Sequence, residues 1–427
     1  MIKTFFASGL RKNIAQLLSA NVLSQVIALI VYPLITRLYT PEEFGVFNIF
    51  MSICSVCFVL SAGRYDGAII QSKTNKEAAA VFHLCLIITA CLSVCLVATI
   101  FFFKNQLLQF FSIEKIGWGI YIMPMLVFCY GVGTVLNRWF NRFKQYRSMS
   151  RYLIVQSGVN SLFKVLLGWL HYTRLGLVFS LFLGYVMSLL SIIFTNGKRR
   201  IFSFLVDFDK RRIATVAKQY TDFPKYALPH AFVNMLSSNL PILVMAPYFG
   251  EKQIGLYSLA MAIGFCPINV IVSSINQVFY QQVTEYYNSG EPIKPIFRNF
   301  SIKTLGLFLP LFVLIYFVLP PAVDFLFGGD WHETSRYLQV LIPWFFAMLF
   351  TGTFAFIPVV FFKQRMAMTI EIIYTICRLL ALIYGVFVND FYLAIVAFSG
   401  VSFVFIAGQF IWYYSLILRY ENRCSEK

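Results

Sequence analysis

The sequence predicts an all-α polytopic membrane protein, and three observations carry this prediction. Hydrophobic residues make up 59% of the 427 residues and charged residues only 12%, whereas about a quarter of the residues in a soluble domain are charged. The apolar residues gather in stretches of about 20, the length of a membrane-spanning helix. None of these stretches alternates between polar and apolar residues as an outer-membrane barrel strand does. Helices are therefore expected, because they satisfy their own backbone hydrogen bonds in lipid.

Twelve such stretches are predicted, six on each side of a basic segment. The first six lie at 13–36, 44–62, 79–103, 117–136, 152–170 and 176–195. The second six lie at 226–249, 255–279, 303–322, 337–362, 366–388 and 392–418. The prediction is two six-helix lobes.

The basic segment 196–225 is the predicted boundary between the lobes. It carries eight Lys or Arg against three Asp, so it is unsuited to the hydrocarbon layer. The predicted domains are an N-terminal lobe (1–195), a cytoplasmic linker (196–225) and a C-terminal lobe (226–427). With the amino terminus inside, the inner segments hold 27 Lys and Arg and the outer segments six. Both termini are therefore expected in the cytoplasm.

Nucleic acid is not expected as a partner, although the net charge is +17. Basic loops facing an anionic membrane surface explain such a charge in a chain this apolar. The four His are scattered and the nine Cys lie mostly inside spans. With no catalytic or metal-binding motif in the sequence, we expect no enzyme, no metal site and no cofactor. Coupling to H⁺ or Na⁺ stays open.

An internal repeat joins the two halves. The segment from Tyr39 to Phe47 follows the first span, and Phe249 to Tyr257 follows the seventh, at an offset of 210 residues. A second echo pairs Phe143-Lys144-Gln145 with Phe362-Lys363-Gln364. Because each half has an even number of spans, the halves are expected to be related by a pseudo-twofold axis along the membrane normal. Parallel repeats of this kind are a transporter architecture, with the substrate site between the halves.

Three segments resemble a known family. They are R-L-Y-T-P-E-E-F-G-V-F (37–47), R-Y-D-G-A-I-I (64–70) and the basic loop after the fourth span. The chain resembles the bacterial O-antigen and polysaccharide repeat-unit flippases (Wzx type) of the multidrug/oligosaccharidyl-lipid/polysaccharide exporter superfamily. The resemblance implies a MATE-like, V-shaped pair of six-helix lobes and alternating access. It also implies movement of an undecaprenyl-pyrophosphate-linked oligosaccharide from the cytoplasmic to the periplasmic leaflet. It implies a place in the bacterial inner membrane, with membrane lipids and other polysaccharide assembly proteins as further candidate partners.

Two cations inside spans are the leading candidates for binding substrate. Lys164 lies in the fifth span and Arg378 in the eleventh, which are matching helices of the two halves. Intramembrane charges persist mainly where they face water or a partner, and Arg suits phosphate oxygens. Either side chain could instead extend to the membrane interface. Arg378 could also pair with Glu371, which lies seven residues earlier on the same face of the helix. Glu371 is also a candidate for a coupling proton.

Other polar residues form a second set of candidates. Arg64 and Asp66 end the second span and suit either a gate, contact with the lipid head group, or an ordinary ion pair. Arg37 is a candidate for an outer gate. Sugars are recognised by hydrogen bonds, so polar residues of the first and seventh spans are candidates for the cavity wall. Contacts between helices explain these residues as well. They are Asn21, Gln25, His230, Asn234 and Asn239. The basic loop Arg138 to Arg151 is expected to set topology and to attract an anionic head group.

Other functions stay open beside the flippase. A drug or cation antiporter of the same fold would need membrane carboxylates, and the first and seventh spans hold no Asp or Glu. A polysaccharide polymerase or ligase would need a large outer loop, whereas the longest outer segment, 322–336, is short. A peptidoglycan-precursor flippase of the same superfamily usually has additional spans.

Overall fold

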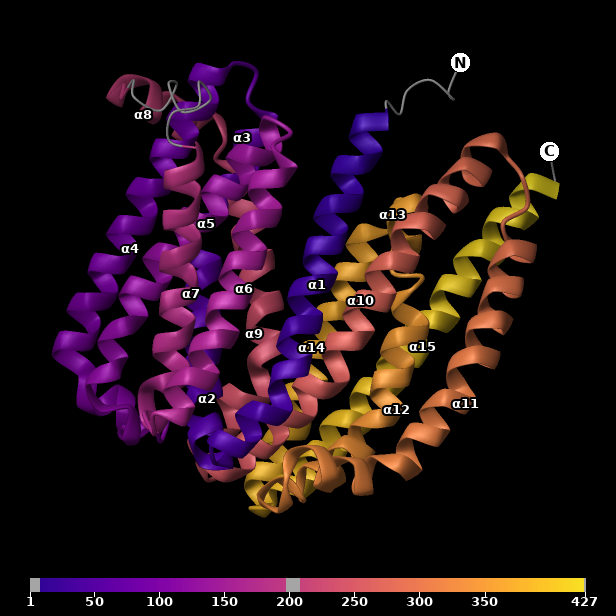
Figure 1. Ribbon diagram of the computed structural model, residues 1–427. Coiled ribbons are helices and arrows are strands. Elements are labelled where there is room, and N and C mark those ends of the chain that lie inside the picture. Colours follow the sequence, from indigo (N-terminus) through magenta and orange to yellow (C-terminus); the bar gives the residue numbers. More distant parts are fainter. Residues whose placement is uncertain (1–7, 197–207, 426–427) are drawn as a thin grey trace. The chain divides into compact units, whose positions relative to one another are not determined.

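The computed structural model describes residues 8–196 and 208–425, and the regular structure within these ranges is helical (Figure 1). In the amino-terminal part the α-helices are α1 (Ser8–Leu38), α2 (Pro41–Leu60), α3 (Asp66–Gln71), α4 (Asn75–Phe110), α5 (Ile122–Arg142), α6 (Tyr146–Trp169), α7 (Thr173–Asn196), α8 (Lys210–Gln219) and α9 (Leu228–Met245). In the carboxy-terminal part they are α10 (Glu251–Ser289), α11 (Lys294–Phe327), α12 (Thr334–Gly352), α13 (Ile357–Val360), α14 (Gln364–Val388) and α15 (Phe391–Ser425). Short helical turns join some of them: η2 (Glu114–Tyr121), η4 (Phe223–Ala227) and η5 (Gly329–Trp331).

Each of the twelve predicted spans coincides with a helix, but only ten helical segments of the described chain are long and apolar enough alone to cross a membrane. The exceptions are α6 and α9. Polar and charged residues interrupt both, among them Gln156, Asn160 and Lys164 in α6 and His230 and Asn234 in α9. The expectation of twelve spans is thus supported for ten, because hydropathy alone does not identify a helix with a polar face.

By packing, the described chain forms two compact units, residues 1–254 and 255–427. The helix α9 belongs to the first unit, where it packs against α2. The lobes predicted from the sequence divide the chain earlier, at the linker 196–225. The two divisions follow different criteria, connectivity in one case and contact in the other, so the lobe boundaries stay a prediction.

The internal repeat has a counterpart in the helix caps. Thr40 precedes α2, and its backbone N–H donates to the Glu43 carboxylate at 3.0 Å. The Glu43 N–H donates to the Thr40 hydroxyl in return, at 3.3 Å, which completes a capping box. At the position 210 residues later, the Gly250 N–H donates to the Gln253 side-chain oxygen at 2.9 Å. The same reach-back bond therefore begins α2 and α10.

Burial after the two caps follows the same pattern. The first two turns of both helices are packed within the chain, with matching apolar positions buried in each copy: Phe44, Val46 and Ile49 in α2, and Ile254, Leu256 and Leu259 in α10. The glycine of each copy, Gly45 or Gly255, is buried between them. The repeat thus specifies a cap followed by a buried first stretch of helix.

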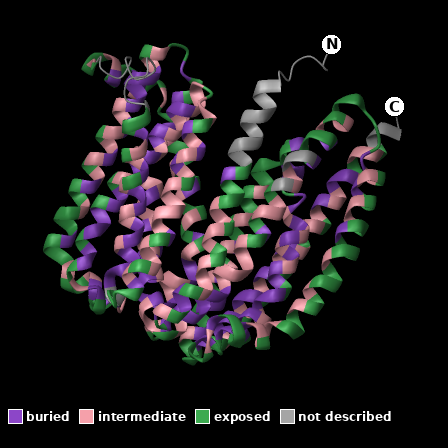
Figure 2. Cartoon of the chain, viewed as in Figure 1, coloured by how far each residue is buried: buried purple, intermediate pink, exposed green. Residues whose placement is uncertain are grey.

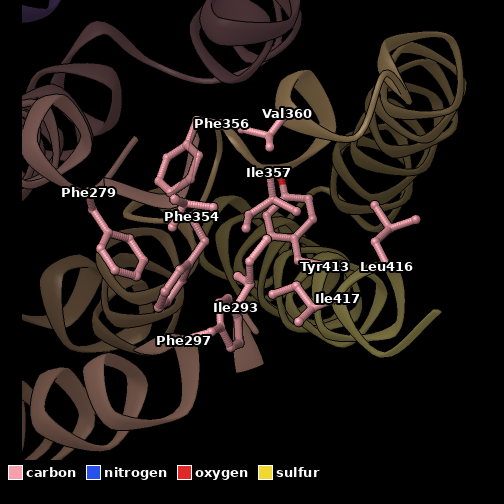
Figure 3. Packing of buried hydrophobic residues seen from close by; sticks show 11 residues of the cluster. Phe279, Ile293, Phe297, Phe354, Phe356, Ile357, Val360, Tyr413, Leu416 and Ile417 are labelled. Carbon is pink, nitrogen blue, oxygen red and sulfur yellow. The ribbon is translucent and has the colours of Figure 1, made fainter. Parts of the chain in front are cut away.

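The second unit has an aromatic core (Figure 3). Phe297 of α11 and Phe354, which follows α12, lie with ring centroids 4.5 Å apart, and Phe279 of α10 packs edge-on against Phe354 at 5.8 Å. Ile417 of α15 is fully buried in the same cluster. Four helices or helix ends meet here, so this cluster fixes one end of the unit.

Large apolar side chains also cover the outside of the helices (Figure 2). Phe102 of α4, Phe325 of α11 and Phe387 of α14 are 72%, 80% and 88% exposed. Patches of this kind are costly in water but favourable against lipid. The chain is therefore a multi-pass membrane protein.

Candidate functional site

Lys164 lies half-buried in the first unit, against an aromatic ring. Its amino group is 5.2 Å from the centroid of the Phe47 ring of α2. The Lys164 carbonyl oxygen accepts a hydrogen bond from the Tyr39 hydroxyl at 2.8 Å. The Tyr39 side chain fits against two glycines, since an added Cβ would lie 2.8 Å from its ring at Gly168 and 2.8 Å from its hydroxyl at Gly176. The residues between the first two spans thus hold the α6 helix and its cation in place.

Arg378 lies in a buried aromatic cage in the second unit. The residue is only 6% exposed. Its guanidinium carbon is 4.4 Å from the ring centroid of Phe398, 4.9 Å from that of Tyr374 and 5.7 Å from that of Trp344. A cation over a ring face gains about 2 kcal/mol when desolvated. The rings stabilise the guanidinium without neutralising its charge.

The two cations share a relation to the internal repeat. Phe47, the ring beside Lys164, corresponds to Tyr257 at the offset of 210 residues. Tyr257 is fully buried and interacts electrostatically with Arg378. A cation of the fifth or eleventh predicted span therefore lies near the same aromatic position of the repeat in each unit. Sequence comparison of the two halves could have indicated that the two cations correspond, because Lys164 and Arg378 lie 214 residues apart, close to the repeat offset of 210 residues.

The Asp66 carboxylate pairs with Arg138, a residue of the basic loop that the sequence analysis expects to set the membrane topology. Asp66 is 3% exposed, and the Nε of Arg138 on α5 donates to it at 2.9 Å. Arg64, two residues earlier, adopts a left-handed backbone conformation with φ of 62°. The turn before α3 therefore orients the two side chains of this motif differently, and it is Asp66 that faces the α5 helix.

Arg142 binds the end of α3. Its Nη1 donates to the carbonyl oxygens of Ile69 at 2.9 Å and Ser72 at 2.8 Å. Its Nη2 donates to the Asn75 side chain at 3.2 Å. These are the carbonyls that a helix end leaves without partners. Two arginines of the basic loop, Arg138 and Arg142, thus fasten α3 to α5.

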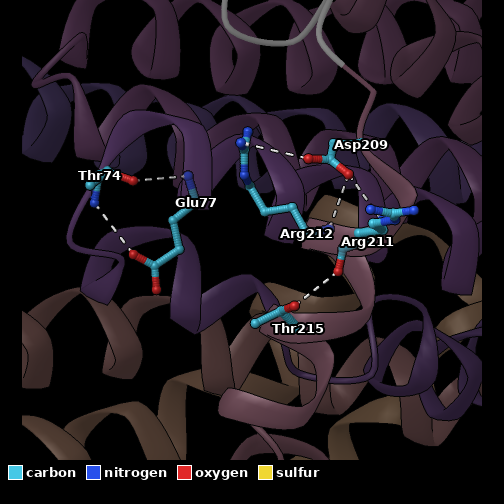
Figure 4. Close-up of polar contacts among 6 residues, drawn as sticks. All are labelled: Thr74, Glu77, Asp209, Arg211, Arg212 and Thr215. Atoms are coloured by element: carbon cyan, nitrogen blue, oxygen red, sulfur yellow. Dashed lines mark hydrogen bonds and ion pairs between the residues drawn. The ribbon is translucent and has the colours of Figure 1, made fainter.

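The basic linker helix α8 is fastened to the same end of the first unit. The Glu77 carboxylate accepts hydrogen bonds from Gln219 at 2.9 Å and from the Tyr220 hydroxyl at 2.8 Å. Glu77 also forms a capping box with Thr74 at the start of α4 (Figure 4). Burial and the hydrogen bond to Glu77 raise the pKa of Tyr220. One carboxylate thus begins α4 and holds the linker.

The remaining candidate residues lie apart from these contacts. Asn21, His230 and Asn234 are exposed, and Gln25 is half-buried. Arg37 is exposed in the last turn of α1. Glu371 is half-buried on α14 and interacts electrostatically with Tyr374 and Tyr413. A role of any of these residues in transport stays a prediction.

Comparison with known proteins identifies relatives of this chain. The model of a family described as polysaccharide biosynthesis protein matches residues 34–336. The succinoglycan biosynthesis transport protein ExoT of Rhizobium meliloti (strain 1021) is 20% identical over 302 residues, which are 70% of this chain and 58% of that protein. The chain thus spans less than two thirds of the length of this relative.

Two solved structures share the fold. An inward-facing multidrug resistance transporter of the MATE family and MOP superfamily aligns with a TM-score of 0.69 and 14% identity, over 93% of this chain and 96% of that chain. The lipid II flippase MurJ, in an inward closed conformation, aligns with a TM-score of 0.69 and 12% identity, over 95% of this chain and 89% of that chain.

The helical membrane fold is shared with these two solved structures, which supports the MATE-like fold that the sequence predicts. The family model covers well over half of the residues. The chain belongs to the polysaccharide biosynthesis protein family, and the relative that it matches is described as a transport protein. The family prediction and the expectation that the chain is not an enzyme are both confirmed.

Proposed function

We propose that this protein is a flippase. It moves an undecaprenyl-pyrophosphate-linked oligosaccharide, an O-antigen or capsule repeat unit, from the cytoplasmic to the periplasmic leaflet by alternating access. Family membership supports transport in polysaccharide biosynthesis, and the fold supports an alternating-access carrier. The bacterial inner membrane is the proposed location, with both termini in the cytoplasm.

The observation that carries the proposal is the pair of cations inside apolar helices. Lys164 and Arg378 lie against aromatic rings, at related positions of the repeat. The π face of a ring stabilises a cation and carries no formal negative charge. The helices α1 and α9 carry no Asp or Glu, the residues that a cation carrier would use. An anionic cargo such as a pyrophosphate-linked glycan fits this charge distribution.

The decisive experiment measures the leaflet distribution of undecaprenyl-pyrophosphate-linked repeat units in cells with and without the protein. The units are expected to accumulate on the cytoplasmic face when the protein is absent. Normal crossing without the protein, with a change only in chain length or drug tolerance, would reject the flippase in favour of a polymerase or an antiporter.

Glu371 is the proposed site of a coupling proton, since it is the half-buried carboxylate on the helix that carries Arg378. A Glu371→Gln variant is expected to respond less to the proton gradient. Transport by this variant with an unchanged response would exclude the role.

A further inference from the structure

An apolar groove runs between α1 and α6 of the first unit. Its volume is about 520 Å³, and its lining residues include Ser19, Leu23 and Val26 of α1 and Ser150 and Ile154 of α6. Leu23 and Val26 are 46% and 41% exposed, so the groove is open along its length. An exposed apolar groove in a membrane protein accepts a hydrocarbon chain without loss of hydrogen bonds.

Two hydrogen bonds show that α1 and α6 run parallel. The Ser157 hydroxyl of α6 donates to the Ser24 carbonyl of α1 at 2.9 Å. Further along both helices, the Tyr39 hydroxyl donates to the Lys164 carbonyl at 2.8 Å. Residue numbers rise in the same direction on both helices between these contacts. The groove therefore lies at the amino-terminal end of α6, next to the basic loop that precedes this helix, and against the middle of α1.

Two arginines lie on the groove side of α6. Arg147 and Arg151 precede the lining residues Ser150 and Ile154 by three positions each, which places them on one helix face. Helical side chains tilt towards the amino terminus, so both guanidinium groups extend beyond the groove at that end. Arg147 is exposed and Arg151 half-buried, and neither forms a hydrogen bond or ion pair with another residue in the described part of the chain.

We infer that this groove binds the lipid part of the cargo, a single-chain polyprenyl diphosphate, with the chain between α1 and α6 and the diphosphate at Arg147 and Arg151. The inference rests on the proposed function. Two adjacent guanidinium forks match the two phosphates of a diphosphate, whereas a phosphodiester lipid offers one charge. One groove takes one chain, whereas a phospholipid has two.

The test measures binding of undecaprenyl diphosphate, undecaprenol and phosphatidylglycerol to the purified full-length protein in detergent by native mass spectrometry. An Arg147→Gln/Arg151→Gln variant is expected to bind undecaprenyl diphosphate at least about tenfold more weakly, as loss of charge-assisted hydrogen bonds requires. Its binding of undecaprenol is expected to stay unchanged. An Ile154→Trp variant fills the groove and is expected to weaken binding of both polyprenyl lipids.

Matched controls separate the groove from the rest of the surface. Leu162→Trp adds the same ring to α6 at a residue that is 63% exposed and outside the groove lining. It is expected to bind all three lipids as the unchanged protein does. Arg147→Lys/Arg151→Lys retains the charge and is expected to keep most of the affinity for undecaprenyl diphosphate.

Two results would overturn the inference. One is an affinity for undecaprenyl diphosphate that both groove variants leave within about twofold of the original, a difference of under about 0.4 kcal/mol. The other is equal competition by phosphatidylglycerol, which would make the groove a site for bulk lipid. Normal transport with normal binding in both variants would reject the groove as the lipid site and leave the proposed flippase function intact. Specific binding in the groove without any translocation would reject the flippase instead.

Discussion

Charged residues inside this molecule are stabilised in two different ways. Asp66 has a direct cationic partner in Arg138, which forms a charge-assisted hydrogen bond to it. Lys164 and Arg378 lie against aromatic rings, whose π faces stabilise a cation. The first arrangement stabilises the structure of the first unit, and the second is suited to an anion that binds and is released.

Removal of either membrane cation is expected to impair transport. A hydrogen bond to a charged group is worth about 1.5–3 kcal/mol, so Lys164→Ala or Arg378→Ala should slow export of surface polysaccharide about ten- to a hundredfold. Surface polysaccharide is measured beside the amount of protein inserted in the membrane. Lys104→Ala is the matched control, because this cation also lies over a ring, that of Tyr121 at 5.5 Å. Normal export by both cation variants would eliminate the cationic site.

Loss of Arg138 is expected to destabilise the fold. An Arg138→Met change leaves the Asp66 carboxylate buried without its hydrogen bond, at a cost of about 2 kcal/mol, moderated because Arg138 is itself 43% exposed. The measurement is thermal unfolding of the purified protein in detergent. Adding Asp66→Asn to Arg138→Met is expected to restore part of the loss, since the buried charge is then removed. Equal stability of the original protein and Arg138→Met would show that the pair contributes nothing.

At the scale of elements, the position of the linker helix α8 depends on side chains outside it. Asp209 caps α8 by accepting hydrogen bonds from the N–H groups of Arg211 and Arg212, at 3.0 and 3.2 Å (Figure 4). The buried side chains of α8, Ile213 and Val216, repeat at the spacing of one helical face. The cap and this face form the helix, whereas Glu77 of α4 and the Tyr65 hydroxyl, which donates to the Ala217 carbonyl at 3.0 Å, hold it in position.

A Glu77→Ala change is therefore expected to loosen α8. Two hydrogen bonds worth about 1 kcal/mol each are lost, so amide exchange in residues 210–219 should rise about tenfold or more. Hydrogen exchange with mass spectrometry reports the change directly. Thr74→Ala is the control, because it removes a hydrogen bond of the α4 capping box and leaves the contacts to α8 intact. Equal exchange in α8 of the two variants would contradict this account of the linker.

At the scale of the whole molecule, the distribution of Lys and Arg predicts which ends of the helices face the cytoplasm. The helix α9 follows the linker and α10 begins after it, so Arg211 of α8 and Lys252 of α10 lie at opposite ends of a helix of 18 residues. In a chain whose native cysteines are replaced, an impermeant thiol reagent added outside should label Lys252→Cys and not Arg211→Cys. Labelling of Arg211→Cys alone would invert the topology.

The fold class and the repeat were readable in the sequence because both depend on local patterns. Apolar runs of the length of a bilayer specify helices, and the capping signals Thr40 to Glu43 and Thr74 to Glu77 mark where two of them begin. The same hydropathy pattern is weaker for α6 and α9, since a helix with a polar face offers fewer apolar residues to the lipid.

By itself the sequence determined the helices, the repeat, the family and the two membrane cations as candidates. Only the tertiary structure decided that Arg138 and Arg142 fasten α3, that Glu77 holds α8, and that Arg378 lies among three rings. It also showed an open groove that needs α1 for its second wall and lies along the face of α6 that carries Ser150 and Ile154. Helix formation follows from neighbours in the chain, whereas most of these contacts join residues many positions apart, and no local pattern records which helices meet.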